Sequence, residues 1–304
     1  MQPFLDFLVG FLNQLVNGIS LGSIYAIIAL GYTMVYGIAK MLNFAHGDVI
    51  MVGAYISYCA FQYWGLSPLA SVLTAMVFCT VLGVIIERLA YRPLRQATSL
   101  AVLITAIGMS YLLQNIALLI FKSDFKNYPK EIINVPSLTA SLYGRELKVS
   151  GVSIVTIVTT IVIMVLLTLF INRTKLGKAM RCVSEDRGAA ELMGISVNKT
   201  ISVTFAIGSA LAAIAAVLLC SAQWNFDPYT GSMPGIKAFT AAVFGGIGSI
   251  PGTMLGGVLL GVIEILGGAY ISTQLSDAIV FLVLIIILLV KPSGLLGKQI
   301  REKV

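Results

Sequence analysis

The feature that most constrains this chain is a series of long apolar stretches, each long enough to cross a lipid bilayer as a helix. A helix needs about 20 predominantly apolar residues to cross a hydrocarbon core of about 30 Å. The composition, 58% hydrophobic and 11% charged, also leaves too few polar side chains for a water-solvated surface. We therefore predict an all-α, polytopic integral membrane protein with about 8–9 transmembrane helices, some of them broken or re-entrant.

The first apolar stretch, Phe4–Ile38, is far longer than one straight span requires, so we expect a broken or strongly tilted first helix. Gly18, Gly22 and Ala26 recur at four-residue spacing, which indicates a second helix packed closely against this one. Further spans are expected over six ranges: Val49–Trp64, Leu69–Ala90, Ser99–Phe121, Val152–Ile171, Ile201–Cys220 and Ser276–Val290.

A glycine-rich interruption divides the apolar stretch Ile236–Ile271. Its centre runs from Gly245 to Gly252 and contains Pro251, which has no backbone N–H to donate within a helix. Glycine also favours an open backbone. We therefore predict two short helices with a break near residues 245–251.

Basic residues are concentrated in three short segments: Arg88–Arg95, Arg173–Lys199 and the tail Lys291–Lys303. By the positive-inside rule, all three are expected in the cytoplasm, and Lys122–Ser150 is then an external loop. The N-terminus lies outside if the first stretch crosses once, and inside if it crosses twice. Because the net charge of +7 is distributed over loops next to spans, it does not predict nucleic-acid binding.

The densest charged block, residues 173–199, is expected to contain two short helices. An apolar stripe at helical spacing predicts that the first continues from the preceding span: Leu176, Ala179, Met180 and Val183. Ser184 is expected to cap the second helix, with Glu185 and Asp186 in its first turn and Gly194 as its stop. The pattern alone fits a solvated hairpin as well as a docking knob.

Four polar side chains lie where the chain is otherwise apolar. Asn43, His46 and Asp48 stand at the start of a short span, where polar groups are costly unless they are satisfied. They either cap a helix or line a transport path. Glu264 is a carboxylate deep inside an expected span, which fits a proton-coupling site or a structural hydrogen bond between helices.

The sequence does not contain a convincing catalytic or cofactor motif. His46 is the only histidine, so there is no histidine cluster for a metal, and the phosphate-binding loop motif of ATPases is absent. A serine protease pair of Ser249 and His46 is much less plausible than a glycine-loop serine beside a capping histidine. The four cysteines fit small apolar core residues. No metal or cofactor bound by this chain is expected.

Several motifs spread over essentially the whole chain carry a family resemblance: Gly31–Gly37, Asn43–Gly47, Glu87-Arg88 with Tyr91–Pro93, Glu185-Asp186 with Gly194-Ile195, Lys237–Val243 with Gly245–Gly252, and Pro292–Gly297. In these motifs the chain resembles the LivH-type permease subunit of branched-chain amino acid ABC importers. The resemblance implies one transmembrane permease domain over residues 1–304, in the cytoplasmic membrane of a bacterium. It also implies a transport subunit that is not itself an enzyme.

The resemblance implies partners as well: a homologous second permease subunit, two cytoplasmic ABC ATPases that bind ATP-Mg, and an extracytoplasmic substrate-binding protein. Similar permeases carry urea or short amides, which is the alternative substrate class. A proton-coupled secondary transporter using Glu264 is the alternative mechanism.

Two groups of site residues follow from this resemblance. The translocation path is expected to involve Asn43, His46, Asp48, Gly246, Gly248, Ser249, Pro251 and Glu264. The segment 173–199 is expected to couple to the ATPase through Arg181, Glu185, Asp186, Ala190, Leu192 and Gly194.

Overall fold

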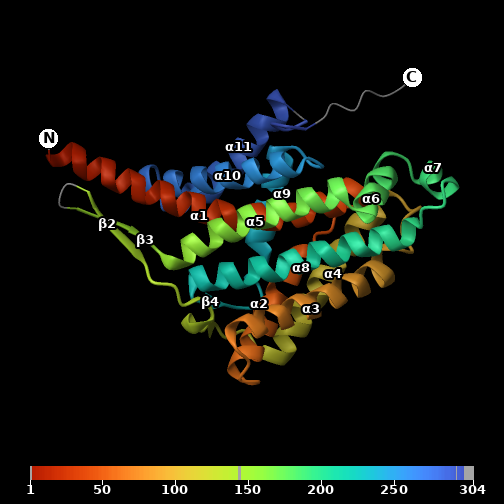
Figure 1. Ribbon diagram of the computed structural model, residues 1–304, viewed down its shortest axis with the longest axis horizontal. Helices are drawn as coiled ribbons and strands as arrows, with labels where there is room; N and C mark the ends of the chain where they lie inside the picture. Colours follow the sequence, from red (N-terminus) through yellow and green to blue (C-terminus); the bar gives the residue numbers. More distant parts are fainter. Residues whose placement is uncertain (1, 143–144, 292, 298–304) are drawn as a thin grey trace.

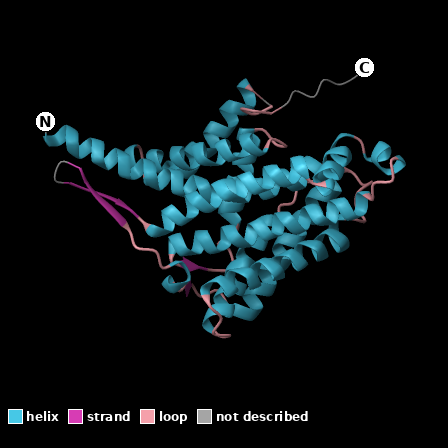
Figure 2. Ribbon diagram, in the orientation of Figure 1, coloured by secondary structure: helices cyan, strands magenta, loops and turns pink. Residues whose placement is uncertain are grey.

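The computed structural model describes residues 2–142, 145–291 and 293–297, which form an elongated bundle of helices (Figure 1). Strands are confined to one end of this bundle (Figure 2). The helices are α1 (Gln2–Ala39), α2 (His46–Gln62), α3 (Pro68–Ile86), α4 (Ser99–Phe121), α5 (Gly151–Arg173), α6 (Lys175–Glu185), α7 (Arg187–Leu192), α8 (Val197–Gln223), α9 (Ser232–Gly245), α10 (Ile250–Tyr270) and α11 (Ser276–Val290).

Shorter elements connect these helices. A π-helix, η1 (Glu87–Tyr91), extends α3, and two 3₁₀ turns are η2 (Lys130–Ile133) and η3 (Thr273–Leu275). The strands are β1 (Lys126–Asn127), β2 (Leu138–Leu142), β3 (Arg145–Val149) and β4 (Asn225–Phe226). Strands β2 and β3 form an antiparallel hairpin, and β1 pairs with β4. The expected loop, residues 122–150, therefore contains β1, η2 and the β2–β3 hairpin.

The prediction of a multi-pass helical membrane protein is confirmed. Within the described residues, seven helices are long and apolar enough to cross a membrane. Helices α2 and α9, of 17 and 14 residues, are shorter and lie among them. Helices α4 and α11 begin and end at the expected residues, Ser99–Phe121 and Ser276–Val290.

The sequence suggested a broken or strongly tilted first helix, and helix α1 is not broken. It is continuous over 38 residues, or about 57 Å at 1.5 Å per residue. Its first half extends beside the β2–β3 hairpin, where the Asn13 side chain accepts a hydrogen bond from the Lys148 backbone N–H (Figure 1). The extra length therefore projects along the hairpin, and no break is required.

Glycines allow α1 and α10 to pack with their backbones almost in contact. A β-carbon at Gly22 would lie 2.7 Å from the Cα of Val258, and one at Gly18 would lie 2.8 Å from the Cα of Val262. From the other side, a β-carbon at Gly257 would lie 2.5 Å from the Cα of Ala26. The close packing predicted from this spacing is confirmed, and α10 is the helix that provides the opposite surface.

Two of the basic segments lie at the same end of the bundle. Arg95, which follows η1, hydrogen-bonds to Asn198 at the start of α8, and Arg187 of α7 donates to the Ala39 carbonyl at the end of α1. The N-terminal half of α1 lies at the opposite end, with the β2–β3 hairpin. Helix α1 therefore runs through the bundle without a break, and its N-terminal end lies opposite α6 and α7. The tail residues 298–303 lie outside the described residues.

Two details of segment 173–199 correct the sequence interpretation. Helix α6 does not continue α5, because Thr174 is extended and its hydroxyl caps α6 by accepting from the Gly177 N–H at 3.0 Å. Asp186, and not Ser184, caps α7 by accepting from the Ala189 N–H at 3.0 Å. The negative charge of Asp186 also interacts favourably with the positive, N-terminal end of the α7 dipole. The Ser184 hydroxyl donates instead to the carbonyl of Arg181.

The stop at Gly194 is confirmed. Its φ of +80° is a left-handed conformation in which glycine is favoured, and its N–H donates to the Glu191 carbonyl. Helix α7 is therefore a short, capped unit between two defined ends.

The α1–α10 contact generates a matched pair of glycine substitutions on one helix. Gly22→Ala should destabilise the protein by about 1–3 kcal/mol, because its β-carbon overlaps the α10 backbone. Gly10→Ala should leave stability equal or slightly higher, because nothing lies within 4 Å of a β-carbon there. Thermal unfolding in detergent distinguishes the two variants. Equal midpoints would contradict the close packing.

Candidate functional site

The chain between α1 and α2 folds back into the bundle. Helix α2 begins at His46, whose imidazole lies against Gly31 of α1, so closely that a β-carbon at Gly31 would overlap it. Gly31 is eight residues before the end of α1 at Ala39, or about 12 Å along the helix. Helix α2 therefore starts inside the bundle and not at its surface.

The start of α9 meets the start of α2 at this depth. A β-carbon at Gly235 would lie 2.9 Å from the Cα of Gly47, and Gly231 is in similarly close contact with Gly47. Two helix N-termini thus lie side by side within the bundle. Backbone N–H groups at a helix N-terminus lack partners within the helix, and they attract anionic groups. This junction therefore brings the free N–H groups of two helices together among apolar helices.

A hydrogen-bonded network of polar side chains joins three helices at the junction. Asp48, 2% exposed, accepts a hydrogen bond from Gln114 Nε2 at 2.8 Å, and Gln114 also donates to the Ser232 hydroxyl at 3.2 Å. These residues belong to α2, α4 and α9. Gln114 was not singled out from the sequence, although a glutamine in the middle of an apolar span was the signal that could have found it.

Asn43, His46 and Asp48 are buried and none of them is the N-cap of α2, so the capping interpretation is wrong. The N-cap of α2 is Ala45, which makes no side-chain capping bond. Asn43 Oδ1 accepts from the Tyr91 hydroxyl at 2.9 Å, because the fold-back places it against η1. The His46 ring packs against Tyr32, with centroids 4.7 Å apart, and its Nε2 lacks a hydrogen-bond partner among the described residues.

Aromatic rings flank the polar network on the side of α1 and α9. Tyr32 packs edge-on against Phe239 of α9, and Phe44 lies against the same ring, both at centroid distances of 5.7 Å. The junction therefore combines buried hydrogen-bonding groups with an aromatic wall. Polar groups beside apolar and aromatic side chains are also the combination that small-molecule sites use.

The predicted break between α9 and α10 is confirmed. Gly246 and Gly248 have φ values of +101° and +95°, and the Ser249 hydroxyl caps α10 by accepting from the Gly252 N–H. Pro251 lies in the first turn of α10, where a missing N–H costs nothing. Helix α10 has 21 residues, so it is longer than the short helix expected.

This break is some distance from the polar junction. It is connected to the junction by α9, whose 14 residues span about 20 Å. The break contacts the segment after α11, where the Leu295 and Leu296 N–H groups donate to the carbonyls of Phe244 and Gly245. The expected path residues at this break thus lie apart from those at the polar junction, and the role of both groups in a path stays a prediction.

Glu264 is held in a network of charged groups between helices. Lys237 of α9 lies 2.7 Å from Glu264 of α10 and 2.6 Å from Asp277 of α11, and the Tyr25 hydroxyl of α1 donates to Glu264 at 3.3 Å. Lys237, the one lysine in the apolar stretch of α9, was the overlooked signal. Of the two roles that the sequence allowed for Glu264, the structural hydrogen bond between helices is present.

Helices α6 and α7 protrude from one end of the bundle (Figure 1). Arg181, Glu185 and Leu192 are exposed there, and Leu192 is 91% exposed. Ala190 is only 3% exposed, so its side chain packs inward and supports α7. Within the described part of the chain, His, Cys, Asp and Glu side chains do not gather in groups of three that could hold a metal.

Removing the amide of Gln114 tests the polar network. Gln114→Leu should lower stability by about 1–3 kcal/mol, because it leaves the buried Asp48 carboxylate without this donor. Asn115→Leu on the same helix should be tolerated, since Asn115 is exposed and bonds only within its own helix. Thermal unfolding of both purified variants checks the expectation. Equal loss in the two would contradict it.

The Lys237 network predicts strong coupling between charges. Lys237→Met should destabilise by about 3–5 kcal/mol, because Glu264, whose side chain is only 11% exposed, is left without its cation. Adding Glu264→Gln should recover part of that loss. A double-mutant cycle of unfolding free energies measures the coupling. Additive effects would show that the pair does not stabilise the junction of α9 and α10.

Comparison with known proteins identifies membrane permeases as relatives of this chain. The family model described as "Branched-chain amino acid transport system / permease component" matches residues 14–288. The chain is 44% identical to the high-affinity branched-chain amino acid transport permease protein LivH of Salmonella typhimurium and 46% identical to BraD of Pseudomonas aeruginosa. Each match covers 97% of this chain and 98% of the relative.

A more distant relative is a probable branched-chain amino acid transport permease protein of Methanocaldococcus jannaschii, 28% identical over 90% of this chain and 89% of its own length. No solved structure matches. Because the family model covers most of the chain and the bacterial relatives align over nearly all of it, this protein belongs to the family of permease components of branched-chain amino acid transport systems.

Proposed function

We propose that this chain forms part of the membrane path of an ATP-driven ABC importer for branched-chain amino acids. The observation that carries the proposal is 44–46% identity, over nearly the whole chain, to permeases with that named substrate class. A homologous second permease subunit completes the path. The complex lies in the cytoplasmic membrane of a bacterium.

The polar junction is suited to a small zwitterion. The Asp48 carboxylate can attract an ammonium group, and the adjacent N-termini of α2 and α9 can attract a carboxylate. The rings of Phe44, Tyr32 and Phe239 offer an apolar surface for an aliphatic side chain. Asn43 and His46 border the same region.

Energy for transport comes from partner subunits. Two cytoplasmic ABC ATPases bind ATP-Mg and dock on the protruding α6–α7 unit. Exposed apolar side chains at its tip, Leu192 at 91% and Met193 at 81%, support this docking role. The same unit carries exposed charged residues, including Arg181, Glu185 and Asp186. An extracytoplasmic substrate-binding protein docks at the opposite end, which carries the β2–β3 hairpin.

Reconstitution tests this function against the alternatives. The chain should co-purify with an ABC ATPase, and proteoliposomes of the complex should take up leucine only with ATP and a substrate-binding protein. Uptake by this chain alone under a proton gradient, lost in Glu264→Gln, would instead support a secondary transporter. Uptake of urea or short amides without leucine uptake would change the substrate class.

Two glycines in α7 and its end offer a matched test of coupling. Gly194→Ala adds about 1–2 kcal/mol of strain at a φ of +80° and should reduce coupled uptake severalfold, because it distorts the end of the docking unit. Gly188→Ala should transport normally, since a β-carbon there meets only Asp186 Oδ1 at 3.4 Å. ATP hydrolysis and leucine uptake are measured together. Unchanged uptake in Gly194→Ala would contradict the coupling role.

A further inference from the structure

A cleft of about 490 Å³ lies at the end of the bundle that carries the basic segments. Its walls come from the end of α1, the loop between η1 and α4, the first turn of α4, and the start of α7. Lys40, Arg95 and Arg187 line it, together with Ser99 and Leu103. Three cations from three separate segments therefore face one space.

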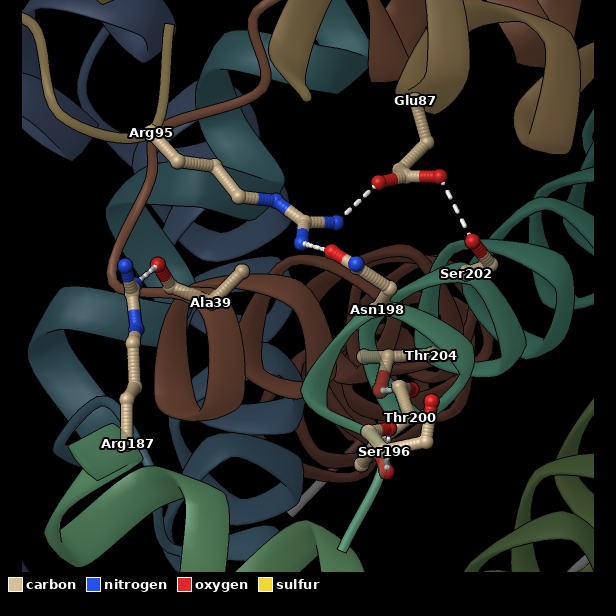
Figure 3. Close-up of polar contacts among 9 residues, drawn as sticks. All are labelled: Ala39, Glu87, Arg95, Arg187, Ser196, Asn198, Thr200, Ser202 and Thr204. Atoms are coloured by element: carbon tan, nitrogen blue, oxygen red, sulfur yellow. Dashed lines mark hydrogen bonds and ion pairs between the residues drawn. The ribbon is translucent and has the colours of Figure 1, made fainter. Parts of the chain in front are cut away.

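The positive charge in this cleft is only partly balanced. Arg95 pairs with Glu87, whose other carboxylate oxygen accepts from the Ser202 hydroxyl at 2.6 Å (Figure 3). Glu87 is fully buried, and each of its two carboxylate oxygens already accepts one of these bonds. Arg187 bonds to the neutral Ala39 carbonyl, also visible in Figure 3. Of the cations lining the cleft, Arg95 alone has a carboxylate partner among the described residues.

Two further observations indicate that the two arginines of the cleft could bind an anion. Arg95 Nε is buried without a hydrogen-bond partner in the described structure. Burial, and to a smaller extent repulsion from the Arg95 charge, lower the pKa of Arg187. Both guanidinium groups line the cleft. An anion between them would relieve this repulsion and bond the free donor.

The wall of the cleft continues into an apolar surface. Leu103 belongs to α4, and the outer face of that helix is exposed, with Leu100 at 63%, Ile104 at 61% and Ile107 at 42%. In a membrane protein such a face contacts acyl chains. A ligand with an anionic head and two hydrocarbon tails would fill the cleft and cover α4 at the same time.

We propose that this cleft binds a phosphate group, and that its source is the headgroup of an anionic phospholipid. The phosphodiester lies between Lys40, Arg95 and Arg187, and the acyl chains follow the exposed face of α4. The lipid thereby links the end of α1 to the start of α7. It holds the protruding α6–α7 unit against the bundle at the membrane surface.

The test measures binding of labelled phosphatidylglycerol to the full chain, purified with its co-purifying subunits in detergent. Each cation removed should weaken binding about fivefold, so Lys40→Gln with Arg187→Gln should weaken it about 25-fold. Lys40→Gln alone is the variant least able to disturb folding, because Lys40 is exposed. Arg88→Gln is the matched control: it removes an exposed cation at the same end that does not line the cleft.

Preferential binding of phosphatidylglycerol over phosphatidylcholine, lost in the Lys40 and Arg187 variants and kept in Arg88→Gln, would support the proposal. Equal binding of the two lipids, or equal loss in Arg88→Gln, would overturn it. Inorganic phosphate is the second probe. If it binds through the same cations while phosphatidylglycerol does not, the lipid source is wrong and a soluble phosphate compound occupies the site.

Discussion

The structure depends on one constraint: backbone polar groups within a hydrocarbon layer must be satisfied by the protein itself. The chain interrupts its helices inside the bundle, and each interruption has partners. At the α9–α10 break, the carbonyls of Phe244 and Gly245 accept from the segment after α11. At the start of α2, the His46 N–H donates to the Asn43 carbonyl. At both places the irregular backbone is therefore satisfied by other parts of the protein.

Glycine determines where these interruptions meet. Gly47 and Gly235 bring the starts of α2 and α9 together, while Gly22 and Gly257 bring α1 against α10. Because α9 connects the two places, the polar junction and the α9–α10 break are held at a defined separation. Lys237 adds a charged link from α9 to α10 and α11. Together these contacts fix the position of the junction that we propose binds substrate.

Charge organises one end of the same bundle. Arg95 and Arg187 tie the η1–α4 loop and α7 to the ends of α8 and α1. These bonds attach the protruding α6–α7 unit to the helix that leads directly to the polar junction. A movement of α7 imposed from outside would therefore act on the end of α1 through Arg187. The anion cleft lies between the same segments, which makes its occupancy relevant to that connection.

The sequence by itself determined which stretches form long apolar helices. Helices α4 and α11 have the expected ends, and the break near Gly245–Pro251 is present, because hydrocarbon thickness and backbone chemistry act locally on composition. The tertiary structure decided the partners of polar groups. Asp48 bonds to Gln114, 66 residues away, and Glu264 to Lys237, 27 residues away. Those pairs, and the continuity of α1, depend on which helix faces pack against each other. The local pattern of apolar and polar residues does not determine which faces meet.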